Sequence, residues 1–178
     1  MQSIVKWLLI CSLLPGVISY AQNTKKSASV QADKYQCIPC GYDCDKEILD
    51  GPGSCAQCKM PLVKTSSINF HTIQPSDICS YIKKHPDVIL LDVRTKEEFE
   101  GRGNPDFGTL KNAINIPIQQ LPGRLTEIAK LKKKDIIVFC SHSHRSPQAS
   151  YMLTQNGFTR ITNMAGGMSV MKDKACMK

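Results

Sequence analysis

The feature that most constrains this chain is an apolar run, residues 136–139, that leads directly into Cys140 and a short polar loop. Four consecutive apolar residues, three of them β-branched, indicate a strand of a parallel sheet that is buried on both faces. Residues 146–156 are predicted to form a helix, with Ser146 at the N-cap and Pro147 at the first helical position. Cys140 therefore lies between a strand end and a helix start, where backbone N–H groups and the helix dipole favour a thiolate.

The residues that follow Cys140 strengthen this interpretation. His142, His144 and Arg145 all occur within the next five positions. Reactive cysteines lie in electropositive, partly exposed settings, whereas structural cysteines are buried and inert. A structural cysteine at a strand end is the alternative. The basic neighbours favour a nucleophile with an acidic thiol.

Strand and helix patterns alternate through the C-terminal region of the chain, residues 68–178. Strands are expected at 68–73, 88–93, 113–116, 136–139 and 158–163, and helices at 75–85, 95–100, 124–131 and 146–156. This alternation is typical of an α/β domain with a mainly parallel sheet flanked by helices. Binding sites in such folds lie at the carboxyl ends of strands, which is where Cys140 falls.

The first 21 residues are predicted to be a signal peptide rather than a piece of the fold. Lys6 precedes a short apolar stretch, and Ser19 and Ala21 supply small residues at the positions that a signal peptidase reads. The apolar stretch is too short to span a bilayer, so we expect no retained membrane span. Residues 22–34 are polar and aperiodic, as in a flexible linker. The sequence thus predicts an exported protein, periplasmic or extracellular.

The net charge of +8 is a modest excess of basic residues. It is compatible with small anionic substrates. The long basic stripe with interleaved aromatic residues that would indicate nucleic-acid binding is missing from the sequence. We therefore expect no nucleic-acid partner, and the sequence identifies no protein partner.

Residues 35–63 are predicted to form a small cysteine-rich module, because five of the nine cysteines fall within 22 positions there. A segment of this length cannot bury a sufficient core and needs a metal ion or disulfides to hold its shape. Two CxxC pairs typically make a closed four-thiolate site for zinc or another soft metal ion. A pair of disulfides is the alternative, which an oxidising compartment would favour. The candidate ligands are Cys37, Cys40, Cys55 and Cys58, with Cys44 as an additional thiol.

Four motifs in the C-terminal region resemble, in their order, those of a single rhodanese domain. They are residues 91–94 with the following Glu98 and Phe99, residues 108–117, residues 140–146, and residues 166–168. The cysteine-rich module in turn resembles a small heavy-metal-binding domain, with Cys40 at the position of a histidine in that family. The resemblance to rhodaneses implies a rhodanese-like fold and sulfurtransferase activity.

In such enzymes a cysteine takes the outer sulfur of thiosulfate, carries it as a persulfide and passes it to cyanide or a thiol. The resemblance therefore implies Cys140 as the nucleophile and Arg145 as the side chain that holds the small anionic sulfur donor. No cofactor is needed for this transfer. The residues expected to shape the substrate pocket are Ser141, His142, Ser143, His144 and Ser146.

The sequence also departs from the family pattern. Ser143 stands where the family usually has glycine, and residues 101–107 look like an insertion beside the site. These departures keep an alternative open, in which the fold is a non-catalytic carrier or docking module that binds metal or sulfur. A phosphatase is disfavoured, because four residues separate Cys140 from Arg145 and cysteine phosphatases have five. Asp92 and Arg94 are expected to form a buried structural pair.

Overall fold

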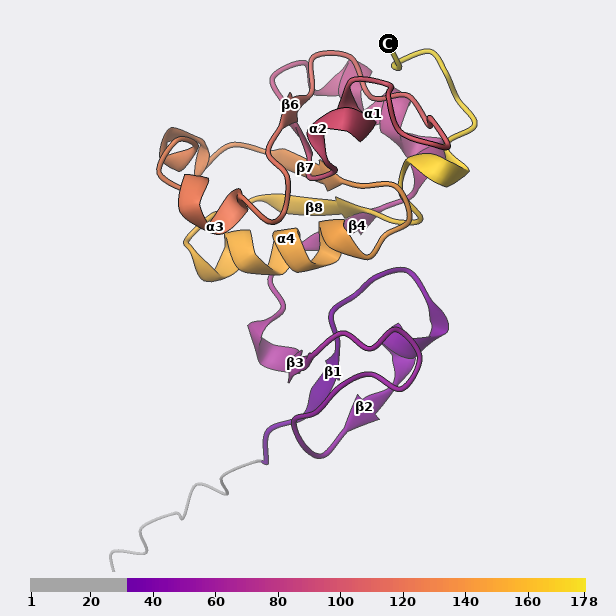
Figure 1. Cartoon of the computed structure of the whole chain (residues 1–178). Helices are drawn as coiled ribbons and strands as arrows, with labels where there is room; N and C mark the ends of the chain where they lie inside the picture. Colours follow the sequence, from indigo (N-terminus) through magenta and orange to yellow (C-terminus); the bar gives the residue numbers. More distant parts are fainter. Residues whose placement is uncertain (1–31) are drawn as a thin grey trace, which may run out of the picture. The chain divides into compact units, whose positions relative to one another are not determined.

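The larger portion of the chain is built on a five-stranded sheet in which all neighbouring strands pair in parallel (Figure 1). The strands are β4 (His71–Ile73), β5 (Ile89–Asp92), β6 (Ile114–Asn115), β7 (Ile136–Phe139) and β8 (Ile161–Met164). Their order across the sheet is β4-β8-β7-β5-β6. This is the mainly parallel α/β sheet that the sequence predicts.

The computed structural model describes residues 32–178. The predicted signal peptide, residues 1–21, and all but the end of the predicted linker lie outside the described residues. Among the residues that are described, no helix combines the length and the apolar character needed to cross a membrane.

The central strand β7 is buried along its whole length, as expected for a strand covered on both faces. Its side chains alternate between two hydrophobic cores. Ile136 and Val138 pack in the same core as Ala149 and Leu153 of helix α4 (Arg145–Gln155). Ile137 and Phe139 pack in the other core, with Ile78 of helix α1 (Ile78–Lys84).

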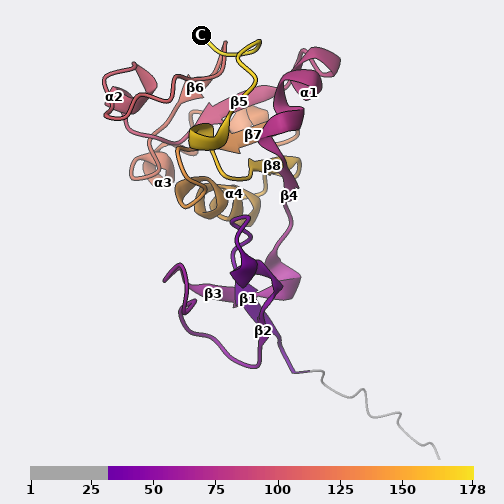
Figure 2. The ribbon, with the colours of Figure 1, turned by 90° about the vertical axis from the view of Figure 1, so that its right-hand side faces the viewer.

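The helices therefore cover the two faces of the sheet, with α4 on one side and α1 on the other (Figures 1 and 2). This layering places the carboxyl end of β7 directly before the first turn of α4. The remaining helical segments are η3 (Pro75–Asp77), α2 (Lys96–Phe99), α3 (Leu121–Arg124), η4 (Ala129–Leu131) and η5 (Met168–Val170).

Two helix predictions were wrong in detail. Helix α4 has His144 as its N-cap, so Ser146 lies inside the first turn, where its hydroxyl faces the Cys140 thiol at 3.4 Å. The predicted helix over 124–131 does not form as one element: only Arg124 belongs to α3, and only residues 129–131 form the short helix η4. Ile128, just before η4, has φ −105° and ψ 9°, outside the α-helical region, so a helix does not continue through it; its side chain is buried in the core.

The cysteine-rich segment folds around a small antiparallel sheet with strand β1 (Tyr35–Cys37) in the middle. Strands β2 (Ile48–Leu49) and β3 (Leu62–Lys64) flank it, and two single-turn helices, η1 (Asp43–Lys46) and η2 (Thr65–Ser67), complete the segment. Its core consists of five side chains, Cys37, Cys40, Cys44, Cys55 and Met60. Sulfur-containing side chains thus form this core, where a larger domain would use aliphatic ones.

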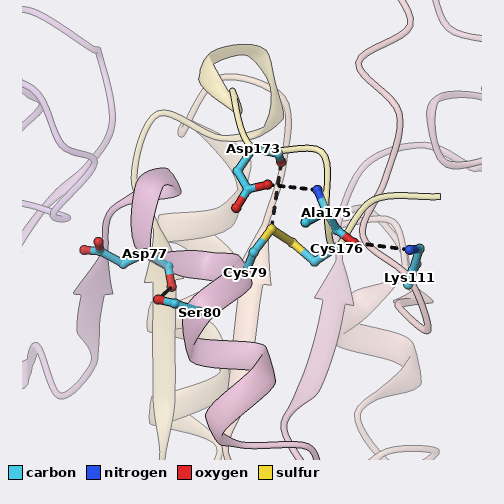
Figure 3. Close-up of a disulfide and its surroundings, with 7 residues drawn as sticks. All are labelled: Asp77, Cys79, Ser80, Lys111, Asp173, Ala175 and Cys176. Atoms are coloured by element: carbon cyan, nitrogen blue, oxygen red, sulfur yellow. Dashed lines mark hydrogen bonds between the residues drawn. A yellow bond between two sulfur atoms is a disulfide. The ribbon is translucent and has the colours of Figure 1, made fainter.

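A disulfide joins Cys79 of α1 to Cys176 near the C-terminus (Figure 3). The sequence analysis did not predict this pair, which links residues 97 positions apart. The bridge fixes the C-terminal segment against the loop before β6, where the Lys111 N–H donates to the Cys176 carbonyl at 2.9 Å. The Lys111 ammonium also donates to the Ala175 carbonyl at 3.2 Å (Figure 3).

Replacing both cysteines of the bridge, in the Cys79→Ser, Cys176→Ser double variant, should lower the free energy of unfolding by about 2–5 kcal/mol, as expected for a disulfide that closes a long loop. Urea denaturation of the oxidised proteins measures the difference. A reducing agent should destabilise the parent by a similar amount and leave the double variant unchanged. Equal stability of parent and variant would contradict a stabilising bridge.

Candidate active site and cysteine cluster

Cys140 lies at the carboxyl end of β7 and is fully buried. The loop that it begins, residues 140–145, is called the Cys140 loop below. A second segment holds the start of this loop, since the Met168 N–H donates to the Cys140 carbonyl at 2.8 Å and the Ser169 N–H donates to the Ser141 carbonyl at 2.9 Å. Gly167 packs so closely here that a Cβ atom would lie 2.5 Å from the Cys140 carbonyl oxygen. The close packing behind Cys140 therefore requires glycine at this position.

Ser143 occupies the middle of the Cys140 loop in a left-handed backbone conformation, with φ 60°. An L-residue other than glycine adopts this region at a cost of about 1–2 kcal/mol. Ser143 is also fully buried, and its hydroxyl has no hydrogen-bond partner among residues 32–178. The loop thus holds a strained residue at the position where a glycine would fit without strain.

Arg145 does not extend freely into solvent but forms a bidentate ion pair with Glu98 of α2. The two guanidinium nitrogens donate to the carboxylate oxygens at 2.6 and 2.8 Å. The Ser141 hydroxyl donates to the same carboxylate at 2.8 Å. Hydrogen bonds from Arg145 are the main cause that lowers the pKa of Glu98 to about 2, and the pairing raises the pKa of Arg145.

The position of Glu98 follows from its place in α2. Thr95 and Glu98 form a capping box, in which the Thr95 side chain accepts from the Glu98 N–H and the Glu98 carboxylate accepts from the Thr95 N–H. The sequence pattern Thr-x-x-Glu signals this cap. The sequence analysis assigned Glu98 no role at the site, and only the tertiary structure brings it to Arg145. In this arrangement Glu98 offsets much of the positive charge that was expected to face an anionic donor.

The two histidines of the Cys140 loop are exposed, and each contacts an aromatic ring. The rings of Phe107 and His142 meet edge to face with centroids 5.2 Å apart. The rings of Tyr42 and His144 are tilted, with centroids 5.6 Å apart. Because Phe107 ends the unusual segment 101–107, that segment does lie beside the loop.

The structure thus brings the predicted residues 140–146 together in one loop and helix start, although Ser146 faces the thiol from inside the helix. Their catalytic and binding roles stay predictions. Asp92 and Arg94 form the expected buried pair at 2.7 Å, and the Thr109 hydroxyl also donates to Asp92 at 3.0 Å. Each charge of this pair is satisfied away from solvent, which is typical of a structural ion pair.

The sulfur atoms of four cysteines in the N-terminal segment lie within 4.8 Å of one another, namely those of Cys37, Cys40, Cys44 and Cys58. The sequence analysis expected Cys55 in the tetrahedral set and Cys44 as the additional thiol. In the structure the turn η1 brings the Cys44 sulfur to 3.7 Å from that of Cys40, so Cys44 joins Cys37, Cys40 and Cys58 in this group, and the ligand set stays a prediction. Cys55 remains buried nearby, and its sulfur accepts from the Cys58 N–H at 3.4 Å.

This sulfur set fits a soft metal ion. Tetrahedral zinc thiolates have Zn–S distances of about 2.3 Å, which places their sulfur atoms about 3.8 Å apart. Burial raises the pKa of Cys37 and Cys40 well above the ordinary value and that of Cys44 to about 11, so a nearby cation is needed to keep these thiols ionised at neutral pH. The cysteines of this segment are free thiols in the structure, unlike the disulfide alternative.

Residues 79–174 match the rhodanese-like domain family. A sulfurtransferase of Allochromatium vinosum is 34% identical over 82 residues, which cover 46% of this chain and 69% of that protein. A tRNA uridine(34) hydroxylase of Cronobacter sakazakii is 27% identical over 125 residues, which cover 64% of this chain and 34% of that protein. A crystal structure from Staphylococcus saprophyticus has a TM-score of 0.50 and 24% identity, covering 61% of this chain and 100% of that chain, and shows the fold alone.

Glu98→Gln should destabilise the protein at neutral pH by roughly 1–3 kcal/mol, because it weakens a charged hydrogen-bond group around Arg145. The low pKa of Glu98 stabilises the folded state above the ordinary value of 4.5, and this stabilisation is lost as the pH falls toward about 2. The difference between parent and variant should therefore shrink over that pH interval, as measured by thermal unfolding.

Glu127→Gln is the matched control, because Glu127 pairs with Arg124 in a more exposed ion pair. An exposed pair contributes about 0–1 kcal/mol, so this variant should stay close to the parent at every pH. A parent–variant difference for Glu98→Gln that is independent of pH would contradict the assignment.

Proposed function

This chain belongs to the rhodanese-like family, and we propose that it is an exported sulfurtransferase that carries sulfane sulfur as a persulfide on Cys140. The donor is a small anionic sulfur compound of the thiosulfate type, and the acceptor is a thiol or cyanide. The observation that carries this proposal is the position of Cys140 between the carboxyl end of β7 and the first turn of α4.

The chemistry follows from that position. The Cys140 thiolate attacks the outer sulfur of thiosulfate, the S–S bond of the donor breaks, and its electron pair leaves with sulfite. The acceptor thiolate or cyanide then attacks the outer persulfide sulfur, and the Cys140 thiolate is released. The transfer needs no external oxidant or reductant. Backbone N–H groups at the start of α4 would stabilise the negative charge on the outer sulfur.

In this proposal Arg145 assists donor capture while it stays paired with Glu98. The ion pair fixes the guanidinium beside the loop at 28% side-chain exposure, so a donor can share its remaining N–H groups without a rearrangement of the loop. The loop residues Ser141, His142, Ser143 and His144 would line the donor path, and Ser146 would hold the thiol through its 3.4 Å contact.

The second candidate is a carrier with little turnover. Two observations favour it, namely the complete burial of Cys140 and the engagement of Arg145 by Glu98. A carrier would form the persulfide but release sulfur slowly to small acceptors. The hydroxylase relatives do not supply a further candidate, because this chain covers about a third of their length and its basic residues form no nucleic-acid pattern.

Two further elements of the proposal rest on cysteine chemistry. The Cys79–Cys176 disulfide supports export, because such bridges persist in oxidising compartments and are rare in the cytosol. The four-sulfur cluster supports a bound zinc ion, for which Cys37, Cys40, Cys44 and Cys58 would be the ligands. The metal would hold the N-terminal segment in shape, and the sulfur transfer itself would take place at Cys140.

Cys140→Ser should abolish both the persulfide formed with thiosulfate and the formation of thiocyanate from cyanide, because it removes the atom that carries the transferred sulfur. Mass spectrometry of the intact protein and a colorimetric thiocyanate assay measure the two effects. Cys55→Ser is a matched control, since Cys55 is another buried free thiol. Normal turnover in Cys140→Ser would refute the sulfurtransferase, and persulfide without turnover in the parent would favour the carrier.

Cys44→Ser should lower zinc binding far more than Cys55→Ser, because Cys44 belongs to the four-sulfur set and Cys55 does not. The parent should hold about one zinc ion per chain, as a closed four-thiolate site does. Elemental analysis after dialysis against a weak chelator measures the ratio. If Cys55→Ser lowered zinc binding more than Cys44→Ser, the ligands would instead be Cys37, Cys40, Cys55 and Cys58, as the sequence predicts.

A further inference from the structure

A short stretch of the cysteine-rich segment touches the Cys140 loop. The Tyr42 hydroxyl donates to the His142 carbonyl at 3.3 Å, and the Tyr42 ring packs on the His144 ring. Next to it, Gly41 has φ +91°, and a Cβ atom at this position would lie 3.3 Å from the Cβ of Ala165. Ala165 lies two residues before Gly167, which packs behind Cys140. Residues 41 and 42 thus contact both the exposed rim of the loop and the segment that supports it.

The other histidine of the loop, His142, also contacts an aromatic ring. Phe107 packs edge to face on His142, so the exposed histidines of the loop lie against two aromatic rings, here called the aromatic clasp (Tyr42 and Phe107). Neither ring belongs to a motif that the chain shares with rhodaneses. Phe107 comes from the unusual segment 101–107, and Tyr42 from the cysteine-rich segment.

Tyr42 is connected to the cysteine cluster through its neighbours in the chain. It lies between Cys40 and Cys44, both of which belong to the four-sulfur set. Coordination of these two sulfurs by one ion would fix both ends of the short stretch between them. Asp45 already organises it, because its carboxylate accepts from the N–H groups of Cys40 at 3.0 Å and Gly41 at 2.6 Å. Tyr42 itself is 42% exposed, so its position depends on this stretch rather than on burial.

We propose that Tyr42 is a specificity-determining residue of the sulfurtransferase: held in place by a metal ion in the cysteine cluster, it closes one side of the entrance to Cys140 and excludes bulky reactants while it admits small ones. The inference rests on the proposed function for its biological meaning. Its physical content, the access of reactants to the Cys140 thiol, is independent of sulfur transfer.

The test uses the full mature chain loaded with zinc. The rate of alkylation of Cys140 is followed by mass spectrometry of the peptide that contains it, once with iodoacetamide and once with a bulky maleimide. Tyr42→Ala should raise the maleimide rate about 5-fold, the change expected when one ordinary hydrogen bond no longer holds the entrance closed. The iodoacetamide rate should change much less. Ile48→Ala is the matched control, because Ile48 is an apolar residue of the same segment with 52% exposure.

Removal of zinc by a chelator supplies the second comparison. Zinc removal should raise the rate at which the maleimide alkylates Cys140 in the parent and in Ile48→Ala. In Tyr42→Ala it should leave this rate unchanged. Equal rates for parent and Tyr42→Ala would overturn the role of Tyr42. An equal effect of the chelator in parent and Tyr42→Ala would overturn the link to the metal. A protein that shows the expected alkylation pattern but forms no persulfide would refute the proposed function and leave the entrance control standing.

Discussion

The burial of β7 on both faces is the constraint on which the rest of this structure depends. A strand whose side chains alternate between two cores must lie in the middle of its sheet, with helices on both sides. Pairing with β5 and β8 then fixes where the strand ends. Because Cys140 follows the last buried residue of the strand, the same packing that stabilises the fold determines the position of the thiol. The loop after it is short, and α4 begins within five residues.

The charge around the thiol is balanced more closely than the sequence suggests. Arg145 and Glu98 neutralise each other beside the loop, and the Ser141 hydroxyl joins their pair. In the proposed function, an anionic sulfur compound would be held by the backbone N–H groups at the start of α4, assisted by the outer side of the Arg145 guanidinium. An anion of low charge density, such as a persulfide, is suited to such a site. Ser143 in the same loop holds a left-handed backbone conformation.

The two regions of the described chain are stabilised by different uses of sulfur. In the C-terminal region a single disulfide ties the end of the chain to α1, while the hydrophobic cores supply most of the packing. In the cysteine-rich segment the thiols are themselves the core. Such a core holds its shape best around a metal ion, since burial keeps isolated thiols neutral. Tyr42 of this segment contacts the Cys140 loop through its hydrogen bond to the His142 carbonyl, and the proposed control of access to Cys140 rests on this contact.

Local sequence was sufficient to predict the parallel α/β sheet, the position of Cys140 and a cluster of cysteine sulfurs that could hold a metal ion, because these depend on apolar runs, helix-start signals and cysteine spacing. The predicted helix over 124–131 is interrupted at Ile128, whose backbone leaves the helical region, and no local pattern reveals this interruption. The pairing of Glu98 with Arg145, the approach of the Cys44 sulfur to that of Cys40 and the disulfide between Cys79 and Cys176 were decided only by tertiary structure. Each of them joins groups whose proximity arises from the path of the chain in space, and spacing along the sequence does not encode that path.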